Sequence, residues 1–230
     1  MNKLKLPAAD IVESPVADIV DRIIDCGVIA VVRLDSSDNL IGAARALASG
    51  GVRSIELTMT TPGVLDVIAQ AQRELGDETL LGAGTVMNAG QAKDAIEAGA
   101  DFLVAPIIDP EVITIADAAG VPMIPGALSV GEIDRAMRLG APLIKLFPGR
   151  VATPGYFKDV LGPLPTARLL PTGNVDLTTA PEYLRAGAVA VGVGKALVDA
   201  VAVAAGDWDL LSERAAAFAG MVRDTRGSQA

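Results

Sequence analysis

The pattern of apolar and polar positions alternates along the chain between the spacing of a helix and short, strand-like apolar runs. Short apolar runs recur, and most follow a stretch with helical spacing that ends in a small residue and a glycine, as in IEAGADFLVA at 96–105. A glycine that ends a helical pattern, followed by an apolar run, is typical of a helix that leads into a strand. The chain is therefore predicted to alternate helices and strands over most of its length.

Eight apolar runs are candidate strands, with helical patterns between most of them. Strands that alternate with helices pair in parallel, and eight such units in 230 residues predict an α/β fold, the (β/α)8 or TIM barrel. A doubly wound open sheet is the alternative. The runs are 28–33, 53–57, 79–83, 101–105, 121–124, 142–147, 168–171 and 188–193.

Two further helices are expected at the ends of this repeat. Ser14 and Pro15 fit the start of a helix that ends at Gly27, and this extra N-terminal helix would cover the base of the barrel. Residues 209–227 read as the closing helix. No linker divides the chain, so residues 1–230 are predicted to be a single barrel domain, with 1–13 as a loose N-terminal segment.

Composition narrows the possible partners. The formal net charge is −9, which argues against binding to nucleic acid, because such binding depends on clustered Lys and Arg. Charges, glycines or prolines interrupt every apolar run before it reaches the length of a membrane span, and the N-terminus has no apolar signal core. We therefore expect no membrane partner and a cytoplasmic location.

The chain has one cysteine and no histidine, and this excludes several kinds of chemistry. Cys26 cannot form an intrachain disulfide, and catalysis by Ser-His-Asp or Cys-His groups is impossible. No set of residues suggests a metal site. The reaction, if there is one, must use Lys, Arg, Asp, Glu, Ser, Thr or Tyr.

Two charged residues interrupt apolar strands. Side chains alternate in facing along a strand, so Lys145 in run 142–147 and Glu56 in run 53–57 are expected to point into the barrel, toward its carboxyl end. A buried structural ion pair would explain both residues. The other explanation is chemical: burial among apolar groups disfavours an ammonium ion, and a neutral lysine attacks carbonyl carbons.

The loops at the same rim offer groups that could bind an anion. Thr85 in GAGTV has a hydroxyl beside an accessible backbone, and Arg33 ends the first strand, where its guanidinium suits a carboxylate or a phosphate. A plain turn and a salt bridge to Asp35 are the ordinary alternatives for these two residues. Gly173 and Gly194, after the last two strands, would leave backbone amides open to a phosphate, to which Lys195 would add charge.

Four motifs in order, GGVRSIELTMTTP, GAGTV, IKLFPG and PTGNV, resemble the family of 2-keto-3-deoxy-6-phosphogluconate and 4-hydroxy-2-oxoglutarate aldolases over about 28–198. The resemblance implies a class I aldolase, in which Lys145 forms the Schiff base and Glu56 transfers protons. Thr85 would hold the pyruvyl carboxylate, and Pro106 and Phe147 would line the pyruvyl pocket. It also implies no metal or other cofactor, 2-keto acid and pyruvate as ligands, and a homotrimer.

The sequence departs from the family at two places. Many members carry an arginine four residues after the glutamate to bind the substrate carboxylate, whereas this chain has Thr60, and we expect Arg33 to take over from the first strand. In the phosphate loops, Asn174 stands where a second glycine is common. Lys195 stands where a small hydroxyl residue is common.

The predicted reaction is the cleavage of a 2-keto-3-deoxy or 4-hydroxy-2-keto acid to pyruvate and an aldehyde, either glyceraldehyde 3-phosphate or glyoxylate. The main rival is a phosphosugar isomerase or epimerase, in which Glu56 would be an enolising base and Lys145 an electrostatic partner. A class II aldolase is disfavoured because it needs a metal. A catalytically silent or engineered assembly component on the same barrel is a hypothesis of another class.

Overall fold

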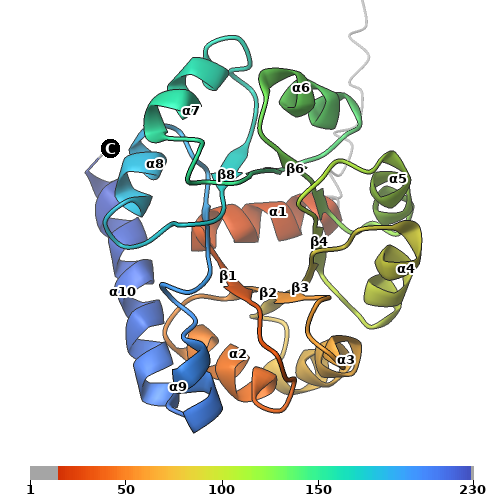
Figure 1. Ribbon diagram of the computed structural model, residues 1–230, viewed down its shortest axis with the longest axis vertical. Helices are drawn as coiled ribbons and strands as arrows, with labels where there is room; N and C mark the ends of the chain where they lie inside the picture. Colours follow the sequence, from red (N-terminus) through yellow and green to blue (C-terminus); the bar gives the residue numbers. More distant parts are fainter. Residues whose placement is uncertain (1–14, 229–230) are drawn as a thin grey trace, which may run out of the picture.

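The computed structural model describes residues 15–228, in which short parallel strands surround a central axis and helices lie outside them (Figure 1). Every predicted apolar run contains a strand. The strands are β1 (Val28–Val32), β2 (Ser54–Thr58), β3 (Leu80–Gly84), β4 (Phe102–Val104), β5 (Met123–Ile124), β6 (Gly126–Ala127), β7 (Ile144–Leu146), β8 (Leu169–Pro171) and β9 (Val191–Val193).

Helices follow most of the strands, as the sequence predicts. They are α1 (Pro15–Cys26), α2 (Leu40–Ser49), α3 (Val64–Leu75), α4 (Ala89–Glu97), α5 (Pro110–Ala118), α6 (Val130–Arg138), α7 (Pro154–Leu161), α8 (Ala180–Arg185), α9 (Ala200–Ala205) and α10 (Trp208–Gly227). Within residues 15–228, none of these helices has both the length and the apolar character needed to cross a membrane.

The parallel strands form two curled sheets rather than one continuous barrel. One sheet has the order β5-β4-β3-β2-β1-β9 and the other the order β6-β7-β8. The fifth strand continues beyond the predicted run 121–124, as β6, and is divided at Pro125, which has no N–H to continue the hydrogen-bond ladder. On the other side, one isolated bridge between Thr172 and Gly192 joins the region after β8 to β9. The parallel α/β fold is confirmed, whereas the strand pairing is not closed.

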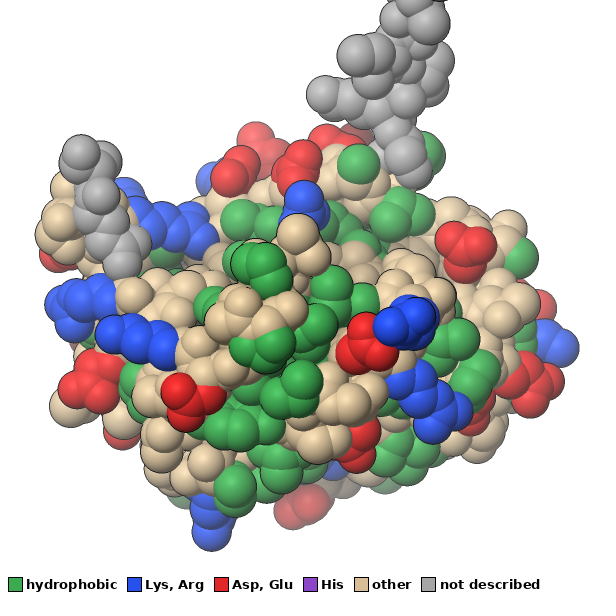
Figure 2. Space-filling model, turned by 90° about the horizontal axis from the view of Figure 1, so that it is seen from above, with side chains coloured by type: hydrophobic (Ala, Val, Ile, Leu, Met, Phe, Trp, Pro, Cys, Tyr) green, Lys and Arg blue, Asp and Glu red, His purple; other side chains and the backbone are tan. Residues whose placement is uncertain are grey.

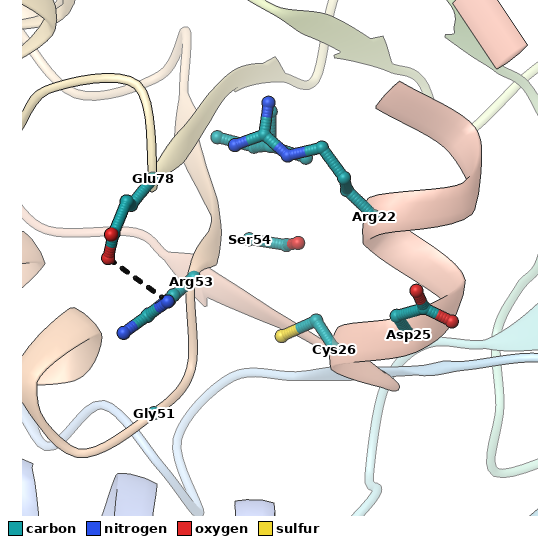
Figure 3. Close-up of a pocket in the computed structure, with 8 residues that line it drawn as sticks. Arg22, Asp25, Cys26, Gly51, Arg53, Ser54 and Glu78 are labelled. Carbon is teal, nitrogen blue, oxygen red and sulfur yellow. Dashed lines mark ion pairs between the residues drawn. The ribbon is translucent and has the colours of Figure 1, made fainter. Parts of the chain in front are cut away.

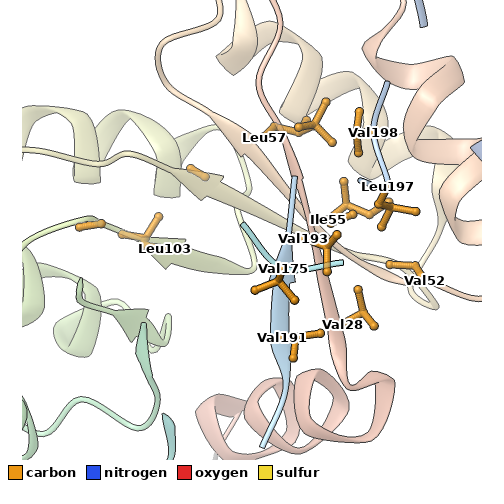
Figure 4. Packing of buried hydrophobic residues seen from close by; sticks show 14 of the residues in the cluster. Val28, Val52, Ile55, Leu57, Leu103, Val175, Val191, Val193, Leu197 and Val198 are labelled. Atoms are coloured by element: carbon orange, nitrogen blue, oxygen red, sulfur yellow. The ribbon is translucent and has the colours of Figure 1, made fainter. Parts of the chain in front are cut away.

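Alternate residues of the strands face two separate apolar cores. Ile55 and Leu57 of β2 point outward and pack with Val28, Val191 and Val193 beneath the helices (Figure 4). The inward-facing residues form a second core at the base of the barrel, and these include Ile29, Leu80, Phe102, Ile124, Leu143 and Leu170. The predicted alternation places Lys145 and Glu56 inside, because their neighbours Ile144, Leu146, Ile55 and Leu57 all face the helices.

The N-terminal helix α1 closes the base, as predicted. Val20 and Ile23 are buried in the inner core, and α1 lies across the centre of the molecule in Figure 1. Gly27 ends the helix with a φ of 71°, a conformation that costs glycine little. From α10, Arg226 donates to the carbonyls of Ile24, Asp25 and Val189, so the last helix holds the end of α1 in place. The predicted N-cap Ser14 and the predicted loose segment 1–13 lie outside the described residues.

Candidate active site

Lys145 lies in the middle of β7 with its amine inside the molecule. Its residue is 5% exposed, and its backbone N–H donates to the carbonyl of Pro125 at 2.9 Å. Its Nζ lies 3.9 Å from Glu56 Oε1 and 5.3 Å from the centre of the Phe147 ring. The carbonyl of Pro125, between β5 and β6, therefore supplies one of the backbone contacts that fix this lysine.

Glu56 faces Lys145 from β2 and is 2% exposed. Its Oε1 accepts no hydrogen bond from any residue of the described chain. Space for the carboxylate comes from the neighbouring strand, because a Cβ at Gly84 would collide with the Glu56 side chain. The glycine of GAGTV thus has a definite role: it lets a buried carboxylate stand beside the lysine.

The pair is poorly described as a structural ion pair alone. Buried pairs stabilise proteins only when their geometry is good and their remaining hydrogen bonds are made. Here the amine and the carboxylate are 3.9 Å apart, beyond hydrogen-bonding distance, and Glu56 Oε1 is unsatisfied within residues 15–228. A buried unsatisfied group of this kind needs an explanation, and the gap between the two groups leaves both able to interact with a ligand.

Arg33 projects from the end of β1 to two threonine hydroxyls. Its Nη1 donates to Thr60 Oγ1 at 2.7 Å and its Nη2 to Thr85 Oγ1 at 2.9 Å. The alternative salt bridge to Asp35 is absent, as Arg33 forms no ion pair within the described residues. Arg33 therefore reaches Thr60, the position where many members of the resembled family carry their carboxylate-binding arginine.

Two residues at this rim have unusual backbone conformations. Thr85 and Asn174 both have a φ of 60°, and they are the non-glycine residues with positive φ in the described chain. Asparagine tolerates this region, but a β-branched residue such as threonine is a genuine outlier there. Strain of this kind often accompanies functional sites, and here it fixes the Thr85 hydroxyl toward Arg33.

An open cavity of about 830 Å³ connects these groups. Its lining includes Arg33, Thr85, Pro106, Lys145 and Phe147, together with Gly173, Asn174, Gly194 and Lys195 from the loops after β8 and β9. Glu56 and Thr60 are not part of the lining, and they reach it through Lys145 and Arg33 respectively. The structure thus brings together residues from strands and loops that are far apart in the sequence.

Three polar residues of this cavity were not predicted: Arg150, Thr172 and Asp176. Arg150 directly follows the IKLFPG motif, and Thr172 is inside PTGNV, so their positions beside the motifs were the available signal. Thr172 also explains why position 192 is a glycine, because a Cβ there would collide with the Thr172 side chain.

A second cavity, of about 320 Å³, lies at the opposite end of the strands, between α1 and the starts of β2 and β3 (Figure 3). Three of its four charged residues are already engaged. Arg53 pairs with Glu78 at 3.1 Å, and Arg22 donates to the carbonyl of Asp77. Catalytic groups of parallel barrels lie at the carboxyl ends of the strands, so the cavity beside Lys145 is the candidate active site.

A buried lysine beside a carboxylate, inside a parallel α/β fold and facing an open cavity, suits a class of enzyme that attacks carbonyl groups through a lysine Schiff base. Residues 19–213 match the aldolase family described as KDPG and KHG aldolase. The chain belongs to this family.

Individual relatives cover most of the chain. A 2-dehydro-3-deoxy-phosphogluconate aldolase of Treponema pallidum is 38% identical over 79% of this chain and 86% of its own length. The KHG/KDPG aldolase of Escherichia coli K12 is 33% identical over 82% of this chain and 88% of its own. A KDPG aldolase from Legionella pneumophila, with pyruvate captured as a covalent carbinolamine intermediate, has a TM-score of 0.80 and 29% identity, covering 88% of this chain and 97% of that one.

Proposed function

We propose that the protein is a class I aldolase that cleaves 2-dehydro-3-deoxy-phosphogluconate to pyruvate and glyceraldehyde 3-phosphate, with 4-hydroxy-2-oxoglutarate as a second substrate. The observation that carries the proposal is the buried Lys145 amine beside the unsatisfied Glu56 carboxylate at the floor of an open cavity. The names of the relatives give the substrates. The carbinolamine captured in the Legionella structure supports covalent chemistry.

In the first half of the reaction, neutral Lys145 attacks the C2 carbonyl of the substrate. Glu56, 3.9 Å away, moves protons while the carbinolamine loses water to give the protonated imine. The imine then accepts the electron pair of the C3–C4 bond. Glu56, directly or through water, takes the proton of the C4 hydroxyl as the aldehyde leaves, and an enamine of pyruvate remains.

In the second half, the enamine is protonated at C3 and the imine is hydrolysed, which releases pyruvate and restores Lys145. Arg33 holds the substrate carboxylate with Thr85, and Pro106 and Phe147 enclose the pyruvyl group. The hydrogen bonds of Arg33 to Thr60 and Thr85 support this assignment, because they aim its guanidinium into the cavity. The loops with Gly173, Asn174, Gly194 and Lys195 face the other end of the substrate.

The test is to incubate the purified protein with 2-dehydro-3-deoxy-phosphogluconate and follow pyruvate with lactate dehydrogenase, with and without EDTA. We expect pyruvate release that EDTA leaves unchanged. An isomerase or epimerase would consume the sugar acid without pyruvate, and a class II aldolase would lose activity with EDTA. A silent assembly component would leave the sugar acid unchanged, so the amount of sugar acid that remains separates it from an isomerase or epimerase.

A homotrimer is also part of the proposal. Figure 2, which looks onto the end of the molecule that carries α6 and α7, shows hydrophobic side chains gathered in the middle of that face with charges around them. The exposed hydrophobic residues include Val130 at the start of α6 and Val151 before α7. Burial of such a patch favours association. Light scattering should give three times the mass of 23.4 kDa, whereas a large closed particle would favour the assembly component.

Three further points complete the proposal. The two curled sheets are inferred to be the halves of one (β/α)8 barrel, because the chain passes directly from β5 through Pro125 to β6 and a bridge links Thr172 to Gly192. Residues 1–230 are inferred to form a single domain. The cytoplasmic location stays a prediction from the sequence.

Arg33→Ala is expected to raise KM for 2-keto acid substrates. A hydrogen bond to a charged group contributes about 1.5–3 kcal/mol, which corresponds to roughly a tenfold to hundredfold loss of affinity. Steady-state kinetics with pyruvate-releasing substrates would measure it. Arg45→Ala, which removes an exposed arginine on α2, is the matched control. An unchanged KM for Arg33→Ala would contradict the role of Arg33.

A further inference from the structure

The turn that ends β2 carries three threonines whose hydroxyls lead, directly or through one another, to the residues just after β1. They are Thr58, Thr60 and Thr61, in the stretch LTMTTP. Thr58 is 0% exposed and Thr61 is 2% exposed. The N–H of Thr61 donates to the carbonyl of Thr58 at 2.9 Å and closes the turn 58–61. Neither of these two buried residues takes part in the proposed reaction.

Thr61 holds the backbone directly after Arg33. Its hydroxyl donates to the carbonyl of Leu34 at 2.9 Å and accepts from the N–H of Leu34 at 3.3 Å. The ladder between β1 and β2 ends earlier, at the pair of Val32 and Leu57. Backbone groups that leave a ladder need other partners, and here one side chain supplies both. Thr61 therefore continues the connection between β1 and β2 past Arg33.

Thr60 and Thr58 hold the guanidinium of Arg33 through two hydroxyls in series. An arginine only donates, so Thr60 Oγ1 accepts from Arg33 Nη1, at 2.7 Å, and keeps its own proton for another acceptor. Thr58 Oγ1 lies 3.0 Å away, in place to accept it. Thr58 points inward as Glu56 does, because the two are alternate residues of β2. The Thr58 hydroxyl thus fixes the rotation of the Thr60 hydroxyl.

The turn 58–61 is also tied to β3. The N–H of Met59 donates to the carbonyl of Gly84 at 2.8 Å. The next residue, Thr85, accepts from Arg33 Nη2 at 2.9 Å. Because β1, β2 and β3 are neighbours in one sheet, the ends of three adjacent strands together hold one guanidinium.

All the partners of this guanidinium are neutral. Arg33 forms no ion pair within residues 15–228. A guanidinium has five N–H donors, and the bonds to Thr60 and Thr85 occupy two of its nitrogens. A carboxylate partner would compensate the charge of Arg33. Hydroxyl partners orient the group and leave its charge for an anion in the cavity that Arg33 lines.

We propose that Thr58 and Thr61 are positioning residues: through Thr60 and Leu34 they hold Arg33 so that its uncompensated charge meets the carboxylate of the substrate. This rests on the proposed function, in which Arg33 binds that carboxylate. The carboxylate itself does not react, so holding it stabilises the bound substrate and the transition state alike. Loss of either hydroxyl should therefore raise KM and leave kcat unchanged.

The first test replaces each hydroxyl by a methyl group. Thr58→Val and Thr61→Val should each raise KM for 2-dehydro-3-deoxy-phosphogluconate by about two- to tenfold, the effect of losing a hydrogen bond between neutral groups. Thr58→Ser and Thr61→Ser keep the hydroxyl and should restore the wild-type KM. Steady-state kinetics of pyruvate release give KM and kcat separately for all four variants.

The Arg33→Ala background separates positioning from packing. There, neither valine substitution should raise KM further, because its effect needs the guanidinium. Thr79→Val is the matched control: Thr79 is a threonine 5% exposed, just before β3, and within the described chain it does not line the cavity. It should leave KM unchanged. The positioning role is wrong if the valine variants keep the wild-type KM, if serine restores nothing, or if valine raises KM equally with and without Arg33.

Lactate binding tests the positioning without the reaction, since lactate has the carboxylate of pyruvate but no carbonyl for Lys145 to attack. Ligand-observed NMR titrations compare the wild-type protein, Thr58→Val, Arg33→Ala and the combined variant. Weaker binding to Thr58→Val than to the wild type, with no further loss when Arg33 is absent, supports the role even if the wild-type protein cleaves no sugar acid. Equal binding to the wild type and Thr58→Val, or no binding to the wild type, overturns it even if pyruvate is released.

Discussion

Lys145→Met should form no covalent adduct with pyruvate and should lose at least about 10⁴-fold in kcat, since loss of a covalent nucleophile removes the reaction path itself. In the wild-type protein, borohydride should reduce the imine of pyruvate and leave a stable adduct on the peptide that carries Lys145. Mass spectrometry after digestion locates that adduct. An adduct on another lysine, or cleavage activity that survives the substitution, would contradict the proposed mechanism.

The substitution also tests stability, because it leaves Glu56 without its cation. Removing one partner of a buried ion pair costs about 3–5 kcal/mol, and Glu56 is 2% exposed. Urea unfolding of Lys145→Met should show this loss. Lys145→Met combined with Glu56→Gln removes both charges and should recover most of the stability while remaining inactive, so loss of activity can be distinguished from loss of the fold.

Much of the fold follows from the periodicity of single runs. In run 142–147, the alternation predicts that Lys145 faces away from Ile144 and Leu146, and the two apolar cores confirm this. The division of the fifth strand at Pro125 could not be predicted from its own apolar run. Whether a strand pairs on both sides depends on neighbours that are distant in the sequence. Here β5 pairs with β4 and β6 pairs with β7, so Pro125 lies between two strand segments that belong to different sheets.

The residues of the candidate site could be predicted from the sequence where a charged residue interrupts an apolar strand. A lysine and a glutamate in apolar strands stand out in the sequence, whereas Arg150 on an exposed loop does not. Its position depends on Tyr183, which reaches the Gly149 carbonyl across 34 residues of sequence. Likewise, the sequence allows the proposal that Arg33 replaces the arginine missing at position 60. The hydrogen bonds from Arg33 to Thr60 and Thr85 could not be predicted, because they depend on how the ends of the strands come together in the folded chain.

Glu56→Gln is expected to lower kcat by about 10² to 10⁴-fold, which is the usual contribution of a positioned acid or base. Glutamine has nearly the same shape, so Gly84 would still leave room for the side chain, while its amide cannot accept and return a proton at each step. Lys145 remains able to attack, so a pyruvate adduct should still be trapped, but more slowly. Exchange of the methyl protons of pyruvate with solvent should fall with kcat.

The control for Glu56→Gln is Ser54→Ala, a substitution on the same face of β2. Ser54 is 1% exposed, and its Oγ has no hydrogen-bond partner within residues 15–228. Removing this hydroxyl should leave kcat unchanged and should not lower the free energy of unfolding, because an unsatisfied buried hydroxyl is itself destabilising. If Glu56→Gln were to keep the wild-type kcat, Glu56 would be only the counter-ion of Lys145. If Ser54→Ala were to lose as much activity as Glu56→Gln, the effect would come from packing of β2 rather than from proton transfer.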